Sequence, residues 1–100
     1  MAVTVTHKPG RMILTTVDDD WVWTRAIILS GVMVMQGAAN DKILLQEDSI
    51  TGAAIIEILL ASADAHMYEF PVPFRCTPAI DISSCVVTGT PTVVLFVMGY

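Results

Sequence analysis

Histidine and cysteine, the side chains that most often serve as acid–base groups and nucleophiles in enzymes, are scarce in this sequence. The 100 residues include two of each, and neither a Gly-x-Ser-x-Gly nor a His-Glu-x-x-His motif occurs. A nucleophilic pair of His66 with Cys76 or Cys85 is conceivable, but a histidine at a strand end and two packed thiols are the simpler interpretation. We therefore predict no catalytic residues, no enzyme activity and no cofactor.

Ligands for a metal ion are equally few. Structural zinc sites use four Cys or His side chains in paired spacing, and the chain has no Cys-x-x-Cys motif. Asp18, Asp19 and Asp20 offer carboxylates, but they lack the glycine-punctuated loop of a calcium hand and are interpreted as a solvated loop. Two cysteines do not form a disulfide framework, although Cys76 and Cys85 could pair if neighbouring strands bring them together; we expect free thiols and no metal site.

Charge is low, and long apolar runs are absent. Charged residues make up 15% of the chain, and the net charge is −5 with five scattered Lys and Arg residues, which argues against nucleic acid as a partner. Residues 26–35 form the longest apolar stretch, which Ser30 and Gly31 interrupt, and a membrane-crossing helix needs roughly 20 residues. Residues 1–8 lack the apolar run of a signal peptide, so we expect a soluble protein that is made in the cytoplasm and has no membrane partner.

Apolar side chains are present in excess. They account for 54% of the residues, whereas ordinary soluble domains have roughly 45–50%. A domain of this size buries only a modest core, so some apolar surface is expected to be covered by another subunit. This predicts a homo-oligomer, either a dimer or a trimer.

Short runs rich in β-branched residues alternate with turn signals along the whole chain, which is typical of a sandwich or barrel. The predicted strands cover residues 3–7, 11–17, 21–29, 42–46, 53–61, 66–72, 79–87 and 92–98, with residues 32–36 continuing the third strand or starting another. The segment 53–61 also has helical spacing, but its flanking turns favour a strand. We predict that residues 1–100 form one all-β domain, an antiparallel β-sandwich of about eight strands, either jelly-roll or immunoglobulin-like.

Several residues refine this prediction. Ser30 and Gly31 are expected to bend a strand or form a bulge. Pro71 and Pro73 should end their strand or confine it to a sheet edge, because proline cannot donate to the ladder. Residues 79–87 alternate cleanly, and residues 92–98 are apolar on both faces, as in a strand at the middle of a covered sheet or at an interface.

Two tryptophans lie two residues apart. In a strand, Trp21 and Trp23 point to the same side. They either pack in the core with Val22 facing out, anchor a protein interface, or form a sugar-stacking platform beside acids such as Asp20. The residues predicted to form a protein interface are Trp21, Trp23, Val94, Phe96 and Met98.

The last two thirds of the chain, residues 40–100, have a rhythm of strands and turns in the segments DKILL (41–45), SITG (49–52), YEF (68–70), RC (75–76) and TPTVVLF (90–96). This rhythm resembles that of small β-sandwich virion proteins of tailed bacteriophages, the head-decoration or cement class. The resemblance implies assembly on the capsid surface, commonly as dimers or trimers over junctions between major capsid proteins, with neither enzyme activity nor a cofactor. The alternatives are a carbohydrate-binding module, another virion component of the tail or connector, and a small hydrolase.

Overall fold

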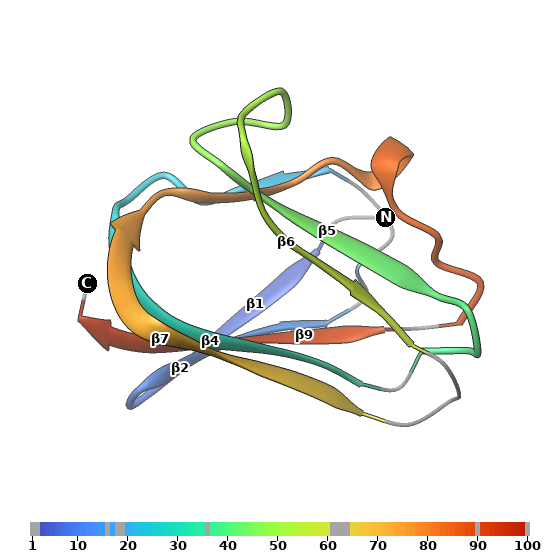
Figure 1. Cartoon of the computed structure of the whole chain (residues 1–100), viewed down its shortest axis with the longest axis horizontal. Coiled ribbons are helices and arrows are strands. Elements are labelled where there is room, and N and C mark those ends of the chain that lie inside the picture. Colours follow the sequence, from blue (N-terminus) through green and yellow to red (C-terminus); the bar gives the residue numbers. More distant parts are fainter. Residues whose placement is uncertain are drawn as a thin grey trace.

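The chain folds into two antiparallel β-sheets that pack face to face (Figure 1). The structure is a computed structural model, and it describes residues 3–15, 17, 20–35, 37–60, 65–89 and 91–99. Within these residues the strands are β1 (Thr4–Lys8), β2 (Arg11–Thr15), β3 (Trp21–Val22), β4 (Ile27–Met35), β5 (Lys42–Glu47), β6 (Ala54–Leu59), β7 (His66–Cys76), β8 (Pro78–Ile80) and β9 (Thr92–Gly99). A single 3-10 turn, η1, covers Ile82–Ser84. The predicted all-β sandwich is confirmed, with nine strands instead of about eight.

The larger sheet has the order β1-β2-β9-β4-β7, and the smaller has the order β3-β8-β5-β6. In Figure 1, β5 and β6 cross over the strands of the larger sheet. The core lies between the two sheets, and its largest fully buried side chains include Met12, Leu14, Ile27, Leu29 and Leu95 from the larger sheet and Ile43, Leu45 and Ile80 from the smaller. Strand β9 is the middle strand of five, as predicted from its two apolar faces.

Two chain segments pass together from one sheet to the other at one end of the sandwich. Strand β4 pairs with β7 in the larger sheet, while β3 pairs with β8 in the smaller sheet. The backbone N–H of Trp23 donates to the carbonyl of Pro78 at 2.9 Å, and both segments curve together in Figure 1. The predicted single strand over residues 21–29 is therefore wrong, because the chain changes sheets between β3 and β4.

Prolines sit inside β7 without ending it. The strand runs through Pro71 and Pro73 and lies at an edge of the larger sheet, which is the edge alternative of the sequence prediction. Opposite these prolines the register of β4 shifts between Leu29 and Gly31, so the predicted irregularity at Ser30 and Gly31 is confirmed as a bulge.

The segment 79–87 is not one strand. Strand β8 ends at Ile80, and the Asp81 side chain then accepts hydrogen bonds from the backbone N–H of Ser83 at 3.1 Å and from its hydroxyl at 2.7 Å. These local bonds compete with a strand ladder and produce the 3-10 turn. By contrast, strand β6 confirms the strand that was predicted within residues 53–61.

One buried carboxylate joins two loops at an end of the smaller sheet. Asp41 Oδ2 accepts from the backbone N–H groups of Ala38 and Gly89, both at 2.9 Å. Its Oδ1 accepts from the backbone N–H of Thr88 at 2.8 Å and from the Thr88 hydroxyl. Burial alone would raise the pKa of Asp41, but these hydrogen bonds outweigh burial and lower the pKa to about 2.

Candidate functional site

The larger sheet has an apolar face that points away from the core. On β9, alternation sends Val93, Leu95 and Val97 into the core and Val94, Phe96 and Met98 to the opposite side. The same reasoning on β2, β4 and β7 extends this surface. We call it the outer face, and its apolar residues are Ile13, Ile28, Met33, Met35, Met67, Val94, Phe96 and Met98. Three of the five predicted interface residues therefore lie together on one surface.

The strand register arranges the outer face in rows. In one row Ile13, Val94, Met33 and Met67 lie side by side on β2, β9, β4 and β7. Val94 is only 3% exposed because its neighbours cover it, whereas Met67 is 46% exposed. Met98, farther along β9, is 69% exposed. Exposed methionine adapts readily to a partner surface, so this arrangement suits protein contact.

The next row is charged at both ends. It contains Lys8, Arg11, Phe96, Gly31 and Glu69, on β1, β2, β9, β4 and β7 in that order. Two cations thus lie on one side of the Phe96 ring and one carboxylate lies on the other side.

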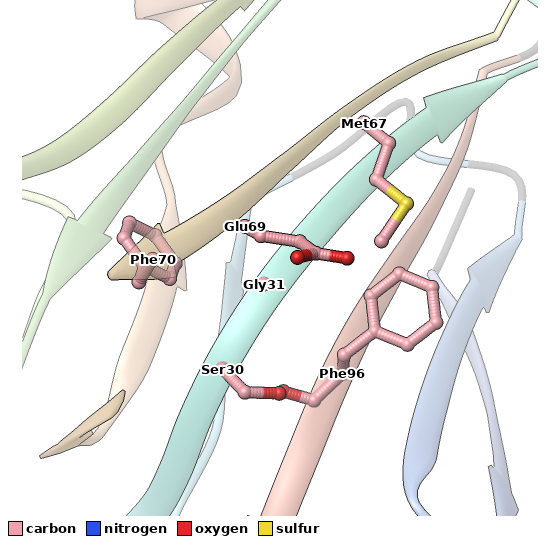
Figure 2. A pocket seen from close by; sticks show the side chains of 6 residues that line it. All are labelled: Ser30, Gly31, Met67, Glu69, Phe70 and Phe96. Carbon is pink, nitrogen blue, oxygen red and sulfur yellow. The ribbon is translucent and has the colours of Figure 1, made fainter. Parts of the chain in front are cut away.

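A hollow opens in this row at Gly31 (Figure 2). It has a volume of about 290 Å³ and is lined by Ser30, Gly31, Met67, Glu69, Phe70 and Phe96. Figure 2 shows Met67, the Glu69 carboxylate and the Phe96 ring around the position of Gly31. A Cβ atom at Gly31 would lie 2.9 Å from the Tyr68 carbonyl oxygen, so the hollow depends on glycine.

The bulge also fixes the wall of the hollow. The Ser30 hydroxyl donates to the Phe96 carbonyl at 3.1 Å and thereby ties β4 to β9 where their register shifts. The sequence pointed to a bulge here but gave no sign that Phe96 and Glu69 would flank it.

The two tryptophans lie elsewhere, at the end of the sandwich beside β1. Trp21 is 9% exposed and belongs to the core, while Val22 is exposed. Trp23 stacks on Trp21 with ring centroids 6.1 Å apart and lies 5.0 Å from the His7 ring. Because Trp21 is buried, the two indoles do not form a surface platform.

An open pocket of about 530 Å³ does adjoin Trp23. It is lined by His7, Lys8, Pro9, Trp23 and Arg25. Its charged lining residues are therefore basic, in a chain whose net charge is −5. This composition would suit an anionic group better than a neutral one.

The thiols are structural in character. Both are free, and Cys76 is buried. Burial, followed by the charges of Glu47 and Asp48, raises the pKa of Cys76 to about 11, and burial also raises the pKa of Cys85. The Cys85 sulfur accepts from the Leu44 N–H and donates to the Asp81 carbonyl, both at 3.4 Å. A raised pKa is the opposite of what an activated thiol nucleophile needs.

His66 opens β7 and Cys76 ends the same strand, so this histidine and this thiol lie at its two ends.

Asp20, named beside the tryptophans, accepts from the Ile82 N–H at 2.8 Å. In the part of the chain that the structure describes, no three His, Cys, Asp or Glu side chains gather closely enough to hold a metal ion. Asp18 and Asp19, considered as calcium ligands, lie outside the described residues. Nor does any helix in the described ranges have the length and apolar character to cross a membrane.

Comparison of the sequence with protein-family models and with curated proteins finds no match.

Proposed function

We propose that this protein is a non-enzymatic structural subunit that works through protein–protein contacts of the outer face, as a decoration or cement subunit of a tailed-phage head. The observation that supports this proposal is the continuous apolar outer face across β2, β9, β4 and β7. A monomeric soluble domain rarely exposes such a patch without a use for it.

The mechanism needs no chemical step. Copies that bind the assembled shell more tightly than its free subunits stabilise the assembled state by mass action. Phe96, at the centre of its row, and the exposed Met98 supply apolar contact area, while Val94 lies in the neighbouring row and is covered there. Self-association of the subunit and attachment to the major capsid protein both fit this mechanism.

Mass spectrometry of purified particles tests the proposal. Virions of the phage that carries the gene should contain the chain in a fixed ratio to the major capsid protein, and immunogold labelling should place it on the head and not on the tail or connector. Absence of the chain from the particles overturns the proposal, and labelling of the tail or connector overturns the assignment to the head.

A matched pair of variants tests the surface itself. Met98→Lys places a charge on the outer face, and Leu59→Lys places the same charge at the 56%-exposed Leu59 on β6 of the other sheet. We expect at least roughly tenfold less Met98→Lys chain in particles, with Leu59→Lys incorporated normally. Equal incorporation of the two variants would contradict a role for the outer face.

Carbohydrate binding is the second candidate, supported by the pocket beside Trp23. Lys8 and Arg25 would pair with a carboxylate or sulfate, and the Trp23 indole would contact the sugar ring. Tryptophan fluorescence should then respond to an oligogalacturonate and not to a neutral galactose oligomer, and Arg25→Ala should abolish the response. No response to either sugar would remove this candidate.

A further inference from the structure

Opposite charges lie at the two ends of one row of the outer face, whereas the exposed Arg75, which pairs with Ile28, lies on β7 in another row. Lys8 and Arg11 occupy the β1 and β2 end, Glu69 occupies the β7 end, and Phe96 on the central strand β9 lies between them. All three charged side chains are exposed. The ion pair between Lys42 and Glu57 lies on the other sheet, and within the described residues Lys8, Arg11 and Glu69 form no ion pair.

We propose that the outer face binds a second copy of this chain, through a twofold axis that runs along β9 in the plane of contact. This deepens the proposed function, on which it rests, by naming the partner of that surface. Such an axis places each row of one copy over the same row of the second copy, with the two ends of the row exchanged. Lys8 then faces Glu69 of the second copy, and the same contact forms again on the other side of the axis.

The hollow at Gly31 can receive a side chain of the second copy. Strand order β1-β2-β9-β4-β7 is symmetric about β9, so the axis places β2 of one copy over β4 of the other. Arg11 therefore points at the Gly31 hollow of the second copy, whose wall carries Glu69. A guanidinium entering a hollow that bears a carboxylate makes a charge-assisted contact, and the absent side chain at Gly31 leaves room for it.

The uncharged residues also match under this axis. Phe96 meets Phe96 of the second copy, Met98 meets Met98, and Ile13 lies over Met33. Aromatic and methionine side chains are enriched at the centres of interfaces, and the charged residues lie toward the rim. The row thus has an apolar centre and ends of opposite charge, so it is complementary to its own copy under the axis.

The distribution of acidic residues also favours contact between two copies through the outer face. Each copy carries a net charge of −5, so two copies repel unless they approach through a surface with few acids. The other acidic residues that the structure describes lie on the smaller sheet and in loops, and they are Asp20, Asp41, Glu47, Asp48, Glu57 and Asp81. Glu69 is the acid that remains on the larger sheet, and it is the one that the axis pairs with a cation.

The size of the face is sufficient. The Cα extents of the molecule are 31 × 23 × 23 Å, so a 31 × 23 Å side has a projected area of roughly 700 Å². Standard specific interfaces bury ~600–1,000 Å² on each partner, and a contact that covers most of this side falls within that range. Two sheets in such contact pack about 10 Å apart.

Charge-reversal variants test the twofold axis. Sedimentation velocity should show a dimer for the wild-type chain, and Arg11→Glu alone or Glu69→Arg alone should raise the dimer Kd roughly tenfold or more, because each puts like charges together twice. An equimolar mixture of the two single variants should form heterodimers with nearly wild-type Kd, because each variant then supplies the charge that the other needs. The double variant R11E/E69R keeps the pairing of positions 11 and 69 with the signs exchanged, so it should dimerise more tightly than either single variant.

Two controls make the outcome decisive. Lys42→Glu removes the intrachain ion pair on the smaller sheet and should leave the dimer Kd unchanged. Circular dichroism checks that each variant is folded, as expected for exposed positions. A wild-type monomer at ~100 μM, or single variants that the mixture does not rescue, would overturn the inference. The particle assay is separate, since a monomer can still be found in virions and a dimer can be absent from them.

Discussion

Replacing Asp41 with asparagine tests whether a buried, ionised carboxylate holds residues 37–41 against residues 86–89. The two side chains have nearly the same shape, so the substitution leaves the space filled. Asparagine has one acceptor oxygen where aspartate has two, and its amide group would point hydrogens at the donors that the replaced oxygen served. The donors that lose their acceptor are the N–H groups of Ala38 and Gly89 or, in the other orientation, the N–H of Thr88, whose hydroxyl can turn to accept from the amide.

The magnitude follows from the hydrogen bonds and from the pKa. A buried donor left without an acceptor costs ~1–3 kcal/mol, and one or two donors are affected, depending on the orientation of the amide. Independently, the pKa of Asp41 falls from its usual 3.8 to about 2, which corresponds to roughly 2 kcal/mol of stabilisation when the group is ionised. We expect Asp41→Asn to lower the free energy of unfolding by ~3 kcal/mol at pH 7, a large part of the 5–15 kcal/mol of a typical domain.

Urea unfolding followed by tryptophan fluorescence measures this change. The matched control is Asp48→Asn, the same substitution at an exposed aspartate with φ 71°, a conformation that asparagine also tolerates. The control should change the free energy of unfolding by less than about 0.5 kcal/mol.

Acid titration adds a second readout for Asp41. Because its folded-state pKa lies below its unfolded pKa, this stabilisation is fully present above pH ~4 and is lost as the pH falls toward 2. The asparagine variant should lack this part of the acid dependence. Equal stabilities of Asp41→Asn and wild type at pH 7, or identical acid profiles, would refute the carboxylate's role.

Three further results are expected. Gly31→Ala should lower stability by ~1–3 kcal/mol in the same urea assay, because its Cβ would approach the Tyr68 carbonyl oxygen at 2.9 Å, and unchanged stability would contradict the tight bulge. Trp21→Ala should cost ~3–5 kcal/mol while Val22→Ala changes little, and a reversed order would contradict the core placement of Trp21. With its pKa raised to about 11, Cys76 should react with iodoacetamide at pH 8 roughly 100-fold more slowly than an ordinary thiol and faster as the pH rises, and rapid labelling of the folded protein would contradict its burial.

The surface that carries the proposals was only partly visible in the sequence. Val94, Phe96 and Met98 alternate along one strand, so their common face follows from the twofold repeat of a strand. Trp21 and Trp23 were grouped with them because tryptophan is common in interfaces, but the structure places this pair at another end of the molecule. Residue type indicates what a side chain is suited to contact, whereas the fold decides which side chains lie next to it in space.

The sequence by itself determined the features that depend on neighbouring residues in the chain. These are the all-β class, the two apolar faces of β9, the bulge at Ser30 and Gly31, and the edge position of a strand that contains two prolines. The wrong prediction of one strand over residues 79–87 also has a local cause. The Asp81 side chain accepts hydrogen bonds from Ser83, and the alternation of apolar residues does not reveal these bonds.

Only the tertiary structure decided which strands became neighbours. The row of Arg11, Phe96, Gly31 and Glu69 joins four strands that are far apart in the sequence, and a shift of one residue in any pairing would send a side chain to the opposite face. Strand order and register are set by packing of the whole core, and periodicity along the chain does not encode them. The sequence therefore contained the apolar excess, and the fold placed Phe96 between two cations and one carboxylate of the same row.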